Sequence, residues 1–128
     1  MSAEENKTLL RRYFDLFNRD WTAALKEYIA DEELAHHIQF FETVFPNYQL
    51  VAEDMVAEGD KVVVRTRMHG RHQGSLMNIA PTGKEVTMPF MIIYRVANGK
   101  IIQHWLIADQ MGLMQQIGAM PAPEALGE

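Results

Sequence analysis

The segment VTMPFMIIYRVANGKIIQHWLIA, residues 86–108, has the pattern of two β-strands joined by a tight turn. Asn98 and Gly99 both accept positive φ, and this dipeptide is the strongest short signal for a β-hairpin. The runs on either side, 86–96 and 101–108, are rich in β-branched and aromatic residues, which favour strands. The segment therefore predicts an antiparallel pair of strands in the last third of the chain.

Two further strands are predicted upstream of this hairpin. Residues 48–57 alternate loosely between apolar and polar side chains, and residues 61–69 (KVVVRTRMH) follow them after a Glu-Gly-Asp turn. Residues 70–84 contain three glycines and a proline, a composition that predicts a loop with strand ends. We therefore expect an antiparallel sheet over about residues 47–109.

The first third of the chain has the period of helices instead. Ser2 and Glu5 match a capping box, and apolar residues then recur every three or four positions. Asp20 and Asp31 each stand where they can cap a further helix. Three helices are therefore expected within about residues 1–46.

This order of elements predicts an α+β fold, in which three N-terminal helices close one face of a curved antiparallel sheet. Such a sheet can leave a pocket between itself and its helices. A short helix at about 110–118 and a mobile tail at 119–128 complete the expected single domain, which spans residues 1–128.

The composition narrows the class of protein. Apolar residues make up 48% of the 128, which suits a packed core rather than a disordered chain. The net charge is −5 with dispersed Arg and Lys, which argues against nucleic-acid binding. No run suits a membrane span, and the acidic start MSAEENK is not a secretory signal, so a cytoplasmic protein is expected. The absence of cysteine excludes disulfides, thiolate zinc sites and cysteine nucleophiles.

One carboxylate, Asp109, stands among apolar residues where the last strand passes into the last helix. Residues two apart on a strand share a face, so Asp109 is expected on the face of Ile107 and Trp105. If that face meets the helices, burial raises the pKa of Asp109 toward the range of a general acid or base. Alternatively, Asp109 caps the last helix, which the spacing by itself favours and which lowers the pKa.

Two histidines are the candidate partners of Asp109. His104 lies on the opposite face by parity, although a bulge could turn it inward, and an interface or solvent position is the alternative. His72, in GRHQG, could line the mouth of the pocket or be a solvated loop residue. His37 falls on the apolar side of its helix and is expected in the core. The histidine spacings suggest no third ligand, so no metal site is expected.

Several side chains are expected to line the pocket and contact a substrate there. Arg65 could hold an anionic or enolate oxygen, although a solvent position or an ion pair is the commoner fate. The rest are apolar or aromatic, and such residues are often plain core. The expected set is Trp105, Tyr13, Phe90, Met88, Ile92, Ile107 and Arg65.

The chain from Phe45 to Gly118 resembles the SnoaL-like polyketide cyclase and ester cyclase family, which belongs to the nuclear transport factor 2-like superfamily. The resemblance is carried, in order, by FP-x-Y, EDMVAEGDKVVVR, G-x-H-x-G, PTGK, IYR-x-x-x-GKI and HW-x-x-x-D-x-x-GLMQQ-x-G. It implies a cone-shaped, cystatin-like sheet closed by three helices, usually as a dimer. It also implies that Asp109 is the acid/base of an intramolecular aldol closure, with His104 and His72 at matching motif positions.

The resemblance supports two main classes of function. The first is a cofactor-independent enzyme in which Asp109, with His72 or His104 as its partner, takes a proton from a small apolar carbonyl compound. The outcome is ring closure, isomerisation or hydrolysis. The alternative is a non-catalytic module that binds a small apolar ligand, or a structural dimer with a vestigial cavity. A homodimer through the sheet face is expected, with no nucleic-acid or membrane partner.

Overall fold

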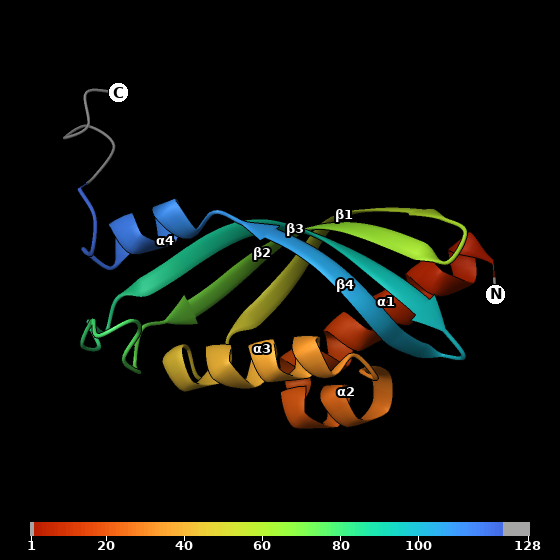
Figure 1. Cartoon of the computed structure of the whole chain (residues 1–128), viewed down its shortest axis with the longest axis horizontal. Coiled ribbons are helices and arrows are strands. Elements are labelled where there is room, and N and C mark those ends of the chain that lie inside the picture. Colours follow the sequence, from red (N-terminus) through yellow and green to blue (C-terminus); the bar gives the residue numbers. More distant parts are fainter. Residues whose placement is uncertain (1, 122–128) are drawn as a thin grey trace.

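The computed structural model describes residues 2–121 and places three helices before a four-stranded sheet (Figure 1), which confirms the predicted α+β class. Most of the predicted tail, residues 122–128, lies outside the described residues. None of the helices between residues 2 and 121 is long and apolar enough to cross a membrane. The elements, in chain order, are α1 (Ala3–Arg19), α2 (Trp21–Tyr28), α3 (Glu32–Val44), β1 (Gln49–Glu58), β2 (Lys61–Arg71), β3 (Glu85–Ala97), β4 (Lys100–Ala108) and α4 (Gln110–Gln116).

Side-chain caps set where the first three helices begin, and they are the predicted ones. Ser2 Oγ accepts the Glu5 amide at 3.1 Å while Glu5 Oε1 accepts the Ser2 amide at 3.2 Å, a complete capping box. Asp20 caps α2 through one side-chain oxygen. Asp31 Oδ1 accepts the Leu34 amide at 3.1 Å at the start of α3. Local sequence therefore decides where each of these helices starts.

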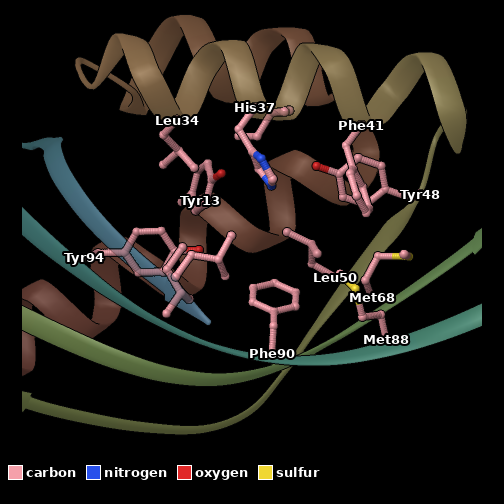
Figure 2. A pocket seen from close by; sticks show the side chains of 13 residues that line it. Tyr13, Leu34, His37, Phe41, Tyr48, Leu50, Met68, Met88, Phe90 and Tyr94 are labelled. Carbon is pink, nitrogen blue, oxygen red and sulfur yellow. The ribbon is translucent and has the colours of Figure 1, made fainter. Parts of the chain in front are cut away.

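The four strands form one antiparallel sheet in the order β1-β2-β3-β4. Asn98 and Gly99 have φ of +53° and +74° in the turn between β3 and β4, which confirms the predicted hairpin. The sheet is curved, and its concave face is turned toward the helices (Figure 1 and Figure 2). The helices therefore cover the space enclosed by the curve.

A β-bulge at Ile102 decides which side chains of β4 face the helices. The pairing of β4 with β3 shifts there by one residue. Ile101, before the bulge, is buried, and the bulge then turns His104 toward the same face. Trp105 and Ile107 are left 41% and 80% exposed on the outer face. The prediction that the Trp105 face meets the helices is therefore wrong, and the bulge considered for His104 is what the strand adopts.

Aromatic packing and one asparagine join α1 to the sheet. The ring of Tyr13 meets those of Phe17 and Tyr94 edge-on, at centroid distances of 6.0 and 6.1 Å. Asn18 donates to the Leu50 carbonyl and accepts from the Leu50 amide, both at 2.8 Å. In contrast, α3 approaches the sheet mainly through its side chains. The space under α3 is therefore shaped by side chains rather than by close backbone packing.

Candidate functional site

A small, mainly apolar cavity lies between α3 and the concave face of the sheet (Figure 2). Its volume is about 40 Å³. Helix α3 forms its roof, and α1 and all four strands contribute the remaining wall residues except Tyr48, which lies just before β1. Four members of the predicted substrate-contacting set line it: Tyr13, Met88, Phe90 and Ile92.

Four polar side chains turn into this otherwise apolar space. Figure 2 shows the hydroxyls of Tyr13, Tyr48 and Tyr94 and the ring of His37 directed toward its centre. The three tyrosines are at most 5% exposed. The side-chain hydrogen bonds within residues 2–121 involve none of these four groups. Because polar groups that line an apolar space need hydrogen-bond partners, the cluster indicates a place for polar atoms of a ligand.

Burial sets the protonation state of this cluster. It raises the pKa of Tyr13, Tyr48 and Tyr94 above the ordinary value, and mutual proximity adds to the rise for Tyr48 and Tyr94. His37 is exposed to solvent on one side, but its partial burial lowers the pKa of the ring, and the nearby His104 lowers it further. The cluster near neutral pH is therefore a neutral imidazole beside three intact hydroxyls.

A neutral imidazole that faces hydroxyl donors in an apolar space suits enolate chemistry. The imidazole can accept a proton from a carbon next to a carbonyl, and the hydroxyls can donate to the oxygen that gains negative charge. The cavity volume, about 40 Å³, is well below the ~300–1,000 Å³ of ordinary ligand sites. A ligand of more than a few atoms must therefore displace lining side chains or extend beyond the cavity.

Asp109 lies outside the cavity. Its side chain is exposed at the start of α4, where Oδ1 accepts the Gly112 amide at 2.9 Å. Gly112 leaves room for this carboxylate, because a Cβ at that position would clash with it. The expected position in an apolar hollow is wrong, and the helix cap is the arrangement observed.

Removal of this cap has a measurable expected cost. Asp109→Ala should lower the free energy of unfolding by about 0.5–2 kcal/mol, because α4 loses its N-cap. Asp109→Asn should change it little, since Asn caps as well as Asp. Urea unfolding measures both variants, and amide exchange at Leu113 locates the effect. An equal loss in both variants contradicts the cap account.

Three other predicted contact residues lie on the outer face of the sheet. Trp105 is stacked near the Arg95 guanidinium, 5.6 Å from the ring centroid, and Ile107 is largely exposed. Arg65 forms an ion pair with Glu53 at 3.4 Å. None of the three lines the cavity, because the pleat of β2 and the bulge in β4 turn them outward, but Trp105 and Ile107 border a groove between α3 and β4.

His72 is buried but does not reach the cavity. It is fully buried, its Nδ1 accepts the Thr82 amide at 3.2 Å, and its ring packs on Phe45 with centroids 5.8 Å apart. Gly74 beside it donates to the Val44 carbonyl, which ties the loop after β2 to the end of α3. The expected place at the pocket mouth is therefore wrong, and the ring anchors this loop instead.

His104 turns inward and stands beside the cavity. Its Nδ1 lies 2.7 Å from Asp31 Oδ2, and the two side chains are 9% and 10% exposed. His104 lines a groove between α3 and β4 that shares His37 and Leu106 with the cavity. No three His, Asp or Glu side chains within residues 2–121 are placed to hold a metal ion, this pair included. Among the three predicted catalytic residues, His104 is the one beside the cavity.

Two functional candidates were missed by the analysis of the sequence. The assignment of His37 to the core is wrong, because the residue is exposed and lines the cavity, and Tyr48, which was not singled out, also faces the cavity. The available signal was that His37 shares the apolar side of α3 with Leu34 and Phe41, which line the same cavity. A polar ring on the apolar side of a helix can lie either in the core or in a pocket. The distance between the helix and the sheet decides which, and the sequence does not give that distance.

The SnoaL-like polyketide cyclase family pattern matches residues 7–117 of this chain. AclR from Streptomyces galilaeus, provisionally described as a hydroxylase, is 25% identical with a TM-score of 0.83, covering 98% of this chain and 88% of its own. TsrD from Streptomyces laurentii is also 25% identical, with a TM-score of 0.78 and coverage of 94% and 99%. IdmH from Streptomyces antibioticus, provisionally described as a polyketide cyclase, is 25% identical with a TM-score of 0.75 and coverage of 88% and 98%.

These similarities confirm the fold that the sequence predicts. They extend over nearly the whole chain in each of the three structures. No curated protein matches the chain. The fold is thereby assigned by comparison, while the chemistry has to be argued from the residues of the cavity.

Proposed function

Because the chain belongs to the SnoaL-like polyketide cyclase family, we propose that it catalyses proton transfer on a small apolar carbonyl compound in the cavity under α3. The reaction class is intramolecular aldol closure, or a related isomerisation or hydrolysis that passes through an enolate. The proposed chemistry uses no metal or organic cofactor, since a proton between two carbonyls is acidic enough for one positioned base.

His37 is the proposed base. Its neutral imidazole takes a proton from the carbon between two carbonyls, and the tyrosine hydroxyls donate hydrogen bonds to the enolate oxygen. The enolate carbon then bonds to a second carbonyl carbon of the same substrate. The oxygen of that carbonyl takes the proton back from the imidazolium, so all substrate atoms are retained and the base is restored. Folding of the substrate by the apolar walls supplies the orientation that ring closure needs.

One observation supports this assignment above the others. The ring of His37 and the hydroxyls of Tyr13, Tyr48 and Tyr94 converge in one apolar space without partners from residues 2–121. A core built only for packing rarely gathers several polar groups around one space, because each of them needs a hydrogen-bond partner. A substrate that brings carbonyl oxygens into the cavity supplies such partners.

A second arrangement assigns the base to Asp109, as the family resemblance implies. Asp109 directly follows Ala108, at the end of the strand that contributes Leu106 to the cavity. In this arrangement the carboxylate leaves the Gly112 amide and turns toward the substrate when it binds. The two arrangements differ in which substitution removes activity, and that difference makes them separable.

The alternative function is a binding module without chemistry. The small volume of the cavity and the presence of Met68 and Met88 in its wall favour it, because flexible thioether side chains adapt to apolar ligands. Such a module would use the same cavity, and its ligand would leave unchanged.

A substrate screen tests the proposed function. β-Diketones, polyketide methyl esters and enones are incubated with the wild-type protein, and products are followed by mass spectrometry and NMR. Conversion of at least one class above the buffer rate is expected. Binding without conversion in every class supports the binding module and counts against the enzyme.

The activity should depend on pH in a defined direction. Because burial lowers the pKa of His37 below its ordinary value of 6.5, the base is neutral above that range and becomes protonated as the pH falls through the lowered value. We therefore expect kcat/KM to rise with pH to a plateau, with its midpoint below 6.5. A profile between about pH 4 and 8 measures this. A rate that falls as the pH rises over the same range contradicts a neutral base.

The outer face of the sheet is the proposed homodimer interface. It carries exposed apolar side chains, Met91, Trp105 and Ile107. The same face bears both signs of charge, since Glu53 lies between Arg65 and Arg67 at 3.4 and 3.1 Å. A two-fold contact places the same patch on both subunits, so a patch with apolar and mixed charged parts is suited to pair with itself. These features support a second copy of the chain as the partner that binds the outer face of the sheet.

Ile107→Lys should disrupt this dimer. Light scattering after gel filtration should report about twice 14.7 kDa for the wild type and a mass near 14.7 kDa for the variant. A charge without a partner in the middle of an apolar contact is the physical reason. Met77→Lys is the matched control, because Met77 is 74% exposed but lies in the loop between β2 and β3. A wild-type mass near 14.7 kDa contradicts the proposal.

A further inference from the structure

A groove between α3 and β4 adjoins the cavity. Its volume is about 790 Å³, and it shares the side chains of His37 and Leu106 with the smaller space. Those two residues therefore form a common wall, with the cavity on one side and the groove on the other. The backbone of α3 is tied to β4 only near the N-cap, among residues 2–121, where the Ala30 and Asp31 amides donate to the Ile101 carbonyl, whereas this wall is made of side chains.

A polar pair, Asp31 and His104, adjoins the groove, and His104 is its member that lines the groove. Asp31 Oδ1 accepts the Leu34 amide at 3.1 Å, and its Oδ2 lies 2.7 Å from His104 Nδ1. The two residues are 73 positions apart, and both side chains are at least nine-tenths buried. The helix cap holds the carboxylate, and the carboxylate holds the imidazole, so the ring is oriented before any ligand arrives.

The other ring nitrogen of His104 is left for a ligand. The carboxylate can only accept, so Nδ1 carries the hydrogen and Nε2 remains available. Nε2 accepts from an enol or hydroxyl O–H when the ring is neutral, and it donates to a carbonyl oxygen when the ring is protonated. Both states suit a substrate that interconverts between ketone and enol.

We propose that the cavity and the groove form one elongated substrate site, in which His104 contacts a carbonyl or enol oxygen while the apolar end of the substrate passes His37. This inference rests on the proposed function and narrows its substrate. The substrate class is an elongated 1,3-dicarbonyl compound with one apolar end. After the common wall moves, the apolar end and the carbonyl next to it enter the cavity, where the tyrosine hydroxyls reach that oxygen, and the second carbonyl lies in the groove at His104.

The volumes of the cavity and the groove support a substrate that extends through both. A cavity of about 40 Å³ cannot enclose the two carbonyls and the carbon chain that ring closure needs. The adjoining groove is about twenty times larger by the same measure, and it is lined by His36, His37 and Phe40 from α3 and by His104, Trp105 and Ile107 from β4. Asp31 is a positioning residue here, because it reaches the ligand only through His104.

The rival account is that Asp31 and His104 merely tie α3 to β4. To separate the two, 1-phenylbutane-1,3-dione is titrated into 15N-labelled wild-type protein, and the ring nitrogens of the histidines are followed by NMR. Binding is measured in parallel for His104→Gln and Asp31→Asn, and Asn preserves the helix cap. His69→Gln is the matched control, because His69 is exposed, its Nδ1 lies 3.1 Å from Thr87 Oγ1, and it lines neither the cavity nor the groove.

We expect the diketone to shift the Nε2 signal of His104 together with the signals of His37. His104→Gln should weaken binding about tenfold, the effect of one hydrogen bond to a group that can carry charge. Asp31→Asn should weaken it less, and His69→Gln should leave it unchanged. A purely structural tie predicts no ligand-dependent shift at Nε2.

Two results overturn the inference. The first is a shift at His37 alone together with unchanged affinity in His104→Gln, and it leaves the proposed function intact. The second is an absence of binding by the wild type at millimolar diketone. A shift at both histidines without turnover of any substrate class supports the elongated site and counts against the proposed enzyme.

Discussion

His37→Gln is expected to lower kcat/KM by about 10²- to 10⁴-fold on any substrate that the wild-type protein turns over. Gln fills a similar space and can still hydrogen-bond, but it cannot take up a proton. The loss should appear mainly in kcat, since the apolar walls that bind the substrate are unchanged. Steady-state kinetics with wild type and variant measures the effect, and circular dichroism checks that the variant is folded.

The same assay decides between the two candidate bases. Asp109→Asn keeps the cap of α4, so a loss of activity in that variant reports on chemistry rather than on folding. If His37 is the base, Asp109→Asn retains activity close to wild type. The reverse pattern, with His37→Gln active and Asp109→Asn inactive, assigns the reaction to Asp109. That pattern would require the exposed carboxylate to leave its cap when the substrate binds.

Phe17→Ala is expected to lower the free energy of unfolding by about 3–5 kcal/mol. Phe17 is 2% exposed, and its ring packs on those of Tyr13 and Tyr48, with centroids 6.0 and 5.2 Å apart. Truncation leaves a void where α1 meets the sheet, and it removes the support of two tyrosines that face the cavity. Urea unfolding of the wild type and the variant measures the loss.

Phe40→Ala is the matched control for this change. Phe40 is 53% exposed on α3, so the same atoms are removed from a position that is already half in water. A change within about 0.5 kcal/mol is expected. Similar losses at the two positions contradict the placement of Phe17 in the core and of Phe40 at the surface.

The position of Asp109 shows how a family motif and a local signal can be carried by the same residue. The spacing before the last helix predicts a cap, and the structure has that cap. The resemblance predicts an acid/base, which the kinetic comparison above tests. Asp109 can serve as both helix cap and acid/base only if its carboxylate exchanges between the Gly112 amide and the substrate.

The sequence by itself determined the elements and their order. A capping box, two capping aspartates and an Asn-Gly turn are local signals, because each acts within about four residues and needs no distant partner. The order of helices before strands then limited the architecture to helices on one face of an antiparallel sheet. The resemblance of the motifs over the same region indicated the family.

Only the tertiary structure decided which side chains meet. One extra residue, Ile102, shifts the pairing of β4 with β3 and reverses the faces of the strand beyond it. That shift brings His104 to Asp31 and turns Trp105 away. The alternation along a strand is a local property, but its register is set by contacts with another strand, and a bulge of one residue exchanges inside and outside.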